Sequence, residues 1–470
     1  MAFRNIEPLY HLFPPQLQDI ACSFGGLLVN ARRYGMQFKR LLRNAETRDL
    51  WNAKEIEEFR DLRLQKFVVH AVNSVPFYRE LFKKLGLSPF EIRSLSDLKK
   101  LPIITKADVL AQPSDFVSEA ASTLDREISQ TGGTTGSGFR FAVSREADIA
   151  QWAFWWRHWR RHGIEPGTWC AFFCCRPLVS ADQKQPPFWR INYPGRQIRF
   201  SGFHMSPDNL CSYVGELHRR RPPWIHGYPS HLALLAGHLL DKGRDLGYQP
   251  KWVTTGSENL LPHQIGLIEK AFGCRPKQHY GISEGVANFS ECECGNLHVD
   301  EDYAAVEFIP QPDGPGMKIV GTNFTNQTTP LIRYDTNDIG ILSNEVCPCG
   351  HPGRIVSAID GREEDYVLLR DGTRIGRMCR IFDDMIHIRE AQIFQEIPGE
   401  IRLKIVRGNG FDANQERRLL QETRKLIGSQ TIIHIDYVKN IPRSSSGKLH
   451  GVVSLIKDAR IVGNSAGVLA

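Results

Sequence analysis

The residues best placed to do chemistry begin with a glycine-rich run that carries hydroxyl side chains between its glycines. Residues 131–138 read Thr-Gly-Gly-Thr-Thr-Gly-Ser-Gly and follow a segment expected to be extended. Glycines let the backbone bend tightly and approach a ligand closely. The exposed N–H groups and threonine hydroxyls of such a run can surround a polyphosphate. The lysine of a Walker loop is absent, so the G-x-x-x-x-G-K-[ST] phosphate loop is excluded.

Four further motifs follow this run in order along the chain. They are Tyr280-Gly281-Ile282-Ser283-Glu284, Tyr334-Asp335-Thr336-Asn337-Asp338, Gly361-Arg362 and Ser446-Gly447-Lys448. One such motif carries little information, but five in this order are specific. The series resembles the adenylate-forming ligase superfamily, and more narrowly its phenylacetate–CoA ligase-like branch. Residues 75–79 and 101–106 look like the entry segment of that branch, and the opening residues with 32–35 resemble homologues encoded among surface-polysaccharide genes.

The resemblance implies a set of contacts with ATP and Mg²⁺. In chain order these are Thr131, Thr134, Thr135 and Gly136 with the phosphates, Tyr280 and Gly281 with adenine, Ser283 with the α-phosphate, Glu284 with Mg²⁺, Asp338 with the ribose hydroxyls, and Arg362 with ribose and phosphate. A carboxylate suits the ribose because its two oxygens can accept two hydrogen bonds. Mg²⁺ prefers carboxylate and phosphate oxygens. The chain departs from the family at several positions: residues 137–140 stand where a lysine or proline often follows the loop, Ser283 replaces threonine, Asn337 replaces a common glycine, and Glu364 replaces the usual hinge aspartate or lysine.

Other segments look like those that line the adenine and acyl parts of the family's site. Gly256, Ser257 and Glu258 form one segment, and His226 with Tyr228 belongs to another. His204, which follows a Gly-Phe pair, could also face the substrate. Each of these residues is equally compatible with an ordinary place in the core or in a loop.

Lys448 ends a serine-rich run that resembles the mobile C-terminal loop of these enzymes. The run reads Pro-Arg-Ser-Ser-Ser-Gly-Lys over residues 442–448. An ammonium group at this place can bridge the attacking carboxylate and the α-phosphate, and a loop of serine and glycine permits the large movement that this requires. In isolation it would be an ordinary exposed lysine. With the rest of the series, Lys448 is the expected catalytic residue, together with Glu284 and Ser283.

Two short cysteine turns, about fifty residues apart, form a potential metal site. Residues 292–298 read Cys-Glu-Cys-Gly-Asn-Leu-His and residues 347–350 read Cys-Pro-Cys-Gly. Thiolates and imidazole are the ligands of tetrahedral Zn²⁺. The expected ligands are Cys292, His298, Cys347 and Cys349, with Cys294 as the alternative to one of the first pair. Four protein ligands would make the zinc structural; otherwise the cysteines are buried thiols.

Bulk composition limits the class of protein. The chain has 470 residues, of which 41% are hydrophobic and 24% charged, with a net charge of +7, as in ordinary globular proteins. Its length suggests about three domain-sized units. The apolar residues 20–29 lack the features of a signal peptide, and no apolar run approaches the roughly 20 residues of a membrane helix. A cytoplasmic chain is expected. Residues 8–43 are expected to form a helix with a solvated face, and a peripheral membrane contact is the less favoured alternative.

Periodicity indicates which elements must position these residues. Tryptophans 152, 155, 156 and 159 share one helical face, which favours packing into the core over a surface for stacking nucleic-acid bases. Strands and helices then alternate to residue 272, which predicts α/β layers with a largely parallel sheet. After residue 361 the pattern changes to strands at 392–396, 401–406 and 432–438 around a helix at 413–427, a compact α+β unit.

These observations predict a large α/β adenylation domain and a small mobile α+β domain. The expected boundaries are a helical segment over 1–45, the large domain over 46–361 with a zinc-binding insertion near 290–352, a hinge at 362–364, the small domain over 365–462 and a flexible tail over 463–470. The resemblance implies ATP-dependent activation of a carboxylic acid, followed by transfer to coenzyme A. Transfer to an amine or carrier is the alternative, and a non-catalytic, zinc-stabilised nucleotide-binding protein is a third. Binding of nucleic acid is not expected, and a homodimer is compatible with the sequence.

Overall fold

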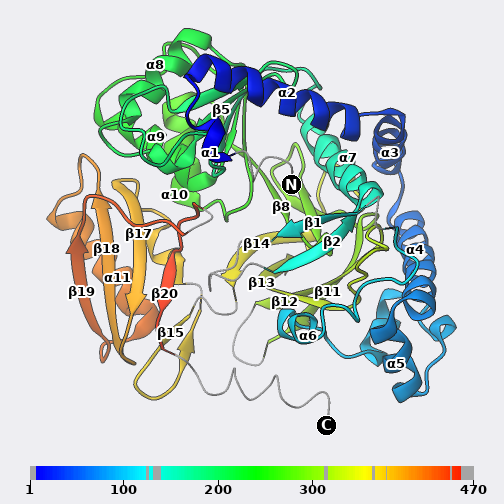
Figure 1. Cartoon of the computed structure of the whole chain (residues 1–470). Coiled ribbons are helices and arrows are strands. Elements are labelled where there is room, and N and C mark those ends of the chain that lie inside the picture. The colour runs from blue at the N-terminus through cyan, green and yellow to red at the C-terminus, as the bar shows by residue number, and fades with distance from the viewer. Residues whose placement is uncertain are drawn as a thin grey trace. The chain divides into compact units, whose positions relative to one another are not determined.

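The computed structural model describes residues 7–122, 126–130, 139–311, 316–362, 366–376, 378–444 and 447–456 (Figure 1). The chain forms two compact units, each assembled from segments that are distant in sequence. The first unit contains Met1–Arg32, Ile164–Gln278 and Asp365–Ile456, and the second contains chiefly Arg33–Gly163 and His279–Glu364. The chain passes from the first unit to the second within strand β8 (Lys277–Gly281).

The first part of the first unit is a mainly parallel sheet with helices between its strands. The strands, in spatial order, are β4 (Trp189–Asn192), β5 (Gln197–Ser201), β3 (Cys170–Cys174), β6 (Trp224–Gly227) and β7 (Trp252–Thr255). The helices are α8 (Leu210–Arg220), α9 (Pro229–Asp241) and α10 (Pro262–Phe272), preceded in the chain by α1 (Glu7–Tyr10) and α2 (Pro15–Arg33). Only β4 runs antiparallel among these five strands. The predicted α/β alternation is confirmed.

The C-terminal part of the first unit has its own small sheet and core. Its strands are ordered β19 (Ile432–Tyr437), β18 (Glu400–Arg407), β17 (Ile388–Gln395) and β20 (Val452–Ser454), with helix α11 (Ala413–Ile427). A short hairpin of β15 (Val367–Leu368) and β16 (Arg374–Ile375) precedes them. Ile393, Leu403 and Leu419 are fully buried together. Asp412 caps α11 by accepting from the amides of residues 414 and 415, and Gly428 follows its last residue.

The second unit combines an antiparallel sheet with a layer of helices. The sheet has the order β11 (Ala304–Pro310), β12 (Met317–Asn323), β13 (Tyr334–Ser343), β14 (Ile355–Arg362), β10 (Leu297–Val299) and β9 (Asn288–Glu291). The helices are α3 (Met36–Arg48), α4 (Ala53–Ser74), α5 (Pro76–Leu85), α6 (Lys106–Ala111) and α7 (Arg145–Arg161), and β1 (Arg126–Gln130) pairs with β2 (Arg140–Ser144). The domain boundaries predicted from sequence stay predictions.

Helix α7 is anchored through a buried charge network. Trp156 and Trp159 are buried, in keeping with the inward-facing tryptophan stripe. Between them Arg157, 2% exposed, donates to Asp300 at 2.6 Å and to Asp302 at 2.9 Å. Asp300 in turn accepts from residues 288 and 290 of β9. Because a buried charge is tolerated only when it is paired, this network holds the helix against the strand that pairs with β8.

Candidate functional site

The predicted adenine and ribose residues meet in the second unit. Tyr280, near the end of β8, donates its hydroxyl hydrogen bond to Asp338 of β13 at 2.8 Å. Its ring stacks on Phe289 with a centroid separation of 4.6 Å. Burial and the neighbouring Asp338 carboxylate raise the pKa of Tyr280 well above its usual range, so the phenol stays a donor. Asp338 also lies opposite Arg362 in the β13–β14 ladder, which brings three predicted nucleotide residues together.

Asn337 occupies a backbone position that explains one departure from the family. Its φ is +61°, in the left-handed region that favours glycine. Asparagine is among the few other residues that adopt this conformation at small cost. Its N–H donates to the Asp335 carboxylate at 2.9 Å, and the N–H of Asp338 donates to the Thr336 hydroxyl at 3.1 Å. The substitution therefore preserves the turn that presents Asp338.

Glu284 follows β8 in the turn after Tyr280. Its carboxylate lies 3.5 Å from the Tyr334 hydroxyl, and its carbonyl accepts from Asn323 at 3.3 Å. Ser283 is exposed, and the Glu284 side chain is half-buried. Gly285, with φ +70°, closes the turn, and a Cβ there would lie 3.1 Å from the Tyr303 hydroxyl. The turn thus holds Glu284 at the start of β13, the strand that carries Asp338.

Several predicted residues lie outside the described part of the chain. Thr131, Thr134, Thr135, Gly136 and the hinge residue Glu364 are among them. For Arg362 the backbone is described but the side chain is not. Their assignments to phosphate, hinge and ribose stay predictions.

The histidines predicted to line a pocket are held by protein contacts in the first unit. His204 is 9% exposed, and its Nε2 lies 3.1 Å from the Ser180 carbonyl, which requires a proton on that nitrogen. Its Nδ1 lies 2.8 Å from the Ser201 hydroxyl. Burial lowers the pKa of His204, so the ring is held neutral. His226 contacts the Thr254 hydroxyl at 2.7 Å. Their substrate roles stay predictions.

Tyr228 and the Gly256-Ser257-Glu258 segment lie near the start of α9. The Tyr228 ring stacks on His231, with an angle of 9° between the planes. Ser257 has φ +69°, a conformation that costs free energy for a residue with a side chain. Glu258, the next residue, accepts from the Ser230 amide at 3.1 Å and from the Leu449 amide at 3.0 Å. One carboxylate therefore caps α9 and holds the backbone directly after Lys448.

The loop that carries Lys448 is a tight turn docked on α9. Ser444 and Lys448 exchange two hydrogen bonds, from the Ser444 amide to the Lys448 carbonyl at 3.0 Å and from the Lys448 amide to the Ser444 hydroxyl at 3.1 Å. Gly447 has φ +76°, and a Cβ there would lie 2.1 Å from the Cys175 sulfur. Only glycine satisfies both the turn and the close approach. The loop thus fits one particular surface of the first unit.

Four residues that hold this loop were not predicted from sequence. Arg443 donates to the Ser230 hydroxyl at 2.7 Å and forms an ion pair with Glu390 of β17. The Cys175 side chain packs closely against the backbone of Gly447. Arg443 lies within the serine-rich motif, and this position in the sequence could have identified it as a residue of the loop. No local pattern marks Ser230 or Glu390, because their relation to Arg443 depends on contacts 213 and 53 residues apart in the chain.

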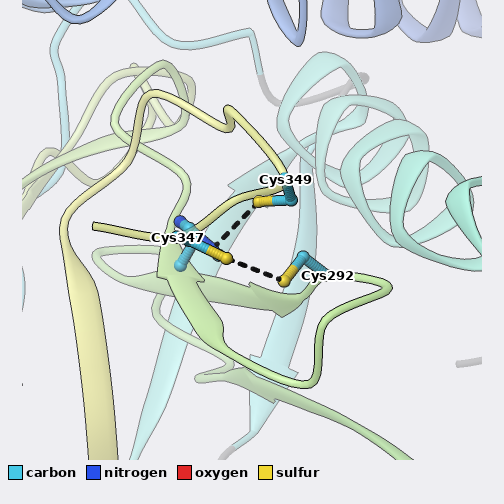
Figure 2. Close-up of side chains that lie close together, drawn as sticks. Cys292, Cys347 and Cys349 are labelled. Carbon is cyan, nitrogen blue, oxygen red and sulfur yellow. Dashed lines mark hydrogen bonds between the residues drawn. The ribbon is translucent and has the colours of Figure 1, made fainter. Parts of the chain in front are cut away.

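The four expected zinc ligands converge in the second unit. The ligand atoms of Cys292, His298, Cys347 and Cys349 all lie within 4.8 Å of one another. Figure 2 shows the three sulfur atoms directed toward one another from the end of β9 and from the loop between β13 and β14. Cys294 is exposed and does not belong to this group. The geometry therefore groups Cys292 and His298 with the second turn, and their assignment as zinc ligands stays a prediction.

The spacing of the cluster and the lowered pKa of Cys347 fit tetrahedral zinc. Two sulfurs bound at about 2.3 Å lie about 3.8 Å apart in a tetrahedron, and the Cys292 and Cys347 sulfurs are 3.7 Å apart. His298 Nδ1 lies 2.9 Å from the Gly353 carbonyl, which leaves Nε2 as the ligand atom, 3.5 Å from the Cys349 sulfur. Burial opposes ionisation of Cys347, but hydrogen bonds led by that from Asn296 lower its pKa to about 6. A thiolate is the form that binds zinc.

Known proteins resemble the chain in both sequence and fold. The family model for the CapK C-terminal domain matches residues 368–455. Protein CapK of Staphylococcus aureus is 26% identical over 457 residues, covering 96% of this chain and 99% of the relative. Phenylacetate-coenzyme A ligase of Thermus thermophilus is 25% identical over 459 residues, covering 86% of this chain and 97% of the relative.

A solved structure shares the fold over most of the chain. It is 2-hydroxyisobutyryl-CoA ligase in the postadenylation state in complex with 2-HIB-AMP, with a TM-score of 0.68 and 19% identity over 89% of this chain and 93% of that chain. The α/β architecture, the near full-length relatives and the meeting of Tyr280 with Asp338 all agree with the resemblance seen in the motifs. In sequence and fold the chain is therefore similar to the phenylacetate–CoA ligase-like branch of the adenylate-forming superfamily.

Proposed function

We propose that the protein uses ATP and Mg²⁺ to convert a carboxylic acid into an acyl-adenylate with release of pyrophosphate, and then transfers the acyl group to the thiol of coenzyme A. The observation that carries the first step is the Tyr280–Asp338 contact, with Arg362 opposite Asp338 in the ladder. The second step is supported by phenylacetate-coenzyme A ligases among the relatives. We propose a cytoplasmic location because ATP and coenzyme A are available there.

In the proposed first step, the acid's carboxylate oxygen attacks the α-phosphorus of ATP and pyrophosphate leaves. Catalysis of such a step consists mainly of positioning and of stabilising negative charge. Asp338 accepts the ribose hydroxyls and Tyr280 covers adenine, while Ser283 contacts the α-phosphate. Glu284 fits Mg²⁺ because its half-buried carboxylate stands on the strand connection next to the nucleotide residues. The bound ion would neutralise phosphate charge.

Lys448 supplies the second cation of the proposed mechanism. Its ammonium group would bridge the acid's carboxylate and the α-phosphate during adenylation, and the loop would leave before transfer to the thiol. The contacts of Glu258 with Leu449 and of Arg443 with Ser230 hold the loop in one definite place. These contacts are few and polar, so they can be exchanged for others as the small domain rotates.

The proposed acyl acceptor, coenzyme A, is inferred from the similar ligases. An amine or carrier is the alternative acceptor, in keeping with the near full-length likeness to Protein CapK, whose name specifies no thiol. We also propose that Cys292, His298, Cys347 and Cys349 hold one structural Zn²⁺. Four protein ligands leave no open coordination position, so the ion would stabilise the fold and take no part in the reaction.

A substrate screen tests the proposed function. Purified protein with ATP and Mg²⁺ is offered a panel of carboxylic acids, and pyrophosphate release is measured with coenzyme A, with amines or with no acceptor. Acid-dependent release that is accelerated by coenzyme A, with the thioester found by mass spectrometry, is the expected result. Acceleration by amines alone would select the alternative acceptor. ATP binding without release for any acid would favour the non-catalytic interpretation.

A further inference from the structure

Helix α2 packs against the first unit with its polar side. Asp19 accepts from the Ile191 amide at 2.8 Å, and Ser23 donates to the Ile191 carbonyl at 3.2 Å. Asn30 donates to the Pro194 carbonyl at 2.8 Å. These partners lie on β4 and in the turn that follows it. The polar side chains of α2 therefore face the rest of the first unit. In an ordinary surface helix the apolar side chains face the protein.

The opposite side of the same helix is apolar and faces outward. Over residues 9–31, whose side chains are all described, every exposed side chain is apolar except Gln16. The outward residues recur at helical spacing, with Ile20 64%, Phe24 59% and Leu27 54% exposed. Leu9, Leu12, Phe13, Leu17, Leu28 and Val29 extend the same exposed apolar set, which we call the α2 face. A continuous exposed apolar face of this length marks a surface for an apolar partner.

The helix cannot turn this face inward without losing its anchors. Gly26 lies so close to β4 that a Cβ there would meet the Asn192 side chain at 1.9 Å. Upstream of the helix, the Tyr10 hydroxyl donates to the Leu178 carbonyl at 3.0 Å. A pocket of ≈ 550 Å³ is lined by Ile20, Phe24 and Leu27 together with Tyr193, which is 57% exposed. The orientation is thus built into the contacts on the polar side.

The charge of the sequence around α2 indicates the kind of partner. Residues 1–43 contain six basic and two acidic residues, an excess of four positive charges out of the chain's net +7. Lys39, Arg40 and Arg43 are exposed on the next helix along the chain. The charged residue on α2 before its last turn is Asp19, which is bonded to β4. An apolar face without exposed charge, followed in the sequence by a basic segment, is the pattern of a helix that lies in the surface of an anionic bilayer.

We propose that the α2 face binds the surface of an anionic lipid bilayer, with Ile20, Phe24 and Leu27 at the boundary of the acyl chains. A lipid surface requires no hydrogen-bond partners from the face, whereas an interface between protein copies ordinarily has about one hydrogen bond per 100–200 Å². A second copy would also bring two basic segments together. Within the described part of the chain, no helix is long and apolar enough to cross the bilayer, so contact is confined to one surface. The proposal does not depend on the proposed reaction.

Flotation with vesicles tests the proposal on the full-length chain. Vesicles of phosphatidylcholine alone and of phosphatidylcholine with phosphatidylglycerol are compared, at low and high salt. The protein should float with the anionic vesicles and less so in high salt, because salt screens the basic residues. Ile20→Glu combined with Phe24→Glu should reduce the bound fraction about tenfold or more, because burying a charge in the interface opposes binding. Lys39→Glu with Arg43→Glu should remove the preference for anionic vesicles.

Matched controls separate this result from general damage and from self-association. Leu50→Glu and Ile397→Glu change apolar residues elsewhere that are also exposed, by 88% and 57%, and these variants should bind vesicles like the unchanged protein. All variants should keep the melting temperature. Sedimentation in lipid-free buffer gives the oligomeric state. A dimer that Ile20→Glu dissociates would overturn the proposal and assign the face to a second copy, and equal flotation of every variant would overturn it as well.

Discussion

At the scale of single residues, Asp338 shows how one carboxylate is prepared for its proposed task. One of its oxygens accepts from Tyr280, and the turn at Asn337 fixes the backbone before it. The contact orients the carboxylate but leaves acceptor capacity, since two oxygens offer about four lone pairs. In the proposed mechanism, the same tyrosine covers the adenine ring of ATP. A single hydrogen bond therefore couples the base-binding and sugar-binding parts of the proposed site.

Asp338→Ala should weaken ATP binding with little change in thermal stability. Loss of hydrogen bonds to a charged acceptor costs about 1.5–3 kcal/mol, so the Kd for ATP should rise roughly ten- to a hundredfold. Calorimetric titration with ATP measures this change, and Asp182→Ala, in an exposed loop of the first unit, is the control. A melting temperature that falls together with the affinity would show that Asp338 serves folding.

The cysteine cluster yields a prediction with a matched control inside the same turn. Protein purified without added metal should contain close to one zinc per chain. Cys347→Ser should lower the zinc content and the melting temperature, because metal binding contributes folding free energy. Cys294→Ser, at the exposed cysteine outside the cluster, should change neither. Metal analysis by mass spectrometry checks both variants; metal-free protein of unchanged stability would make these residues ordinary buried thiols.

At the scale of elements, the start of α9 is a junction between two sheets of the first unit. Glu258 follows β7 and caps α9, and it also holds the loop that precedes β20. At the other end of α9, Asp241 forms a two-pronged ion pair with Arg389 of β17 at 2.6 and 2.9 Å. Because both ends of α9 contact the segment that contains the small sheet, the helix can fix where the small sheet docks. The polar contacts at the start of α9 are the ones nearest the catalytic loop.

Glu258→Gln should slow pyrophosphate release about tenfold while leaving the Kd for ATP unchanged. The amide keeps one acceptor oxygen but loses the charge that strengthens the hydrogen bonds from Ser230 and Leu449. Pre-steady-state measurement of release is the assay, and Glu269→Gln, an exposed glutamate on α10, is the control. If ATP affinity fell in proportion to rate, Glu258 would contact the nucleotide directly, as its segment suggests by resemblance.

At the scale of the whole molecule, the proposed reaction needs Lys448 in one half-reaction only. Lys448→Ala should abolish acid-dependent pyrophosphate release and leave transfer from a supplied acyl-adenylate to the acceptor largely intact, because the loop withdraws before transfer. The two half-reactions are measured separately, and Lys439→Ala, in the same subdomain but outside the loop, should preserve both. Equal loss of both would contradict alternation between two positions of the small domain.

Much of this molecule was accessible from sequence because its signals are local. Helix α11 was expected over 413–427 and is found at Ala413–Ile427, since apolar periodicity, an aspartate cap and a glycine end are all short-range features. The alternating strands and helices followed in the same way. The order of the motifs, together with the resemblance, identified Tyr280 and Asp338 before their contact was known. The cysteine turns named the ligand set and left Cys294 as its alternative.

Only the tertiary structure decided how those pieces are used. Cys294 is exposed and lies outside the four ligand atoms that are within 4.8 Å of one another, which residue type cannot reveal. Glu258 and Arg443 acquire their partners from segments 191 and 213 residues away. Periodicity shows that α2 has a polar and an apolar face, but it does not show which face packs against the rest of the first unit. That choice was made by hydrogen-bonding groups on β4, so the apolar face was left outward.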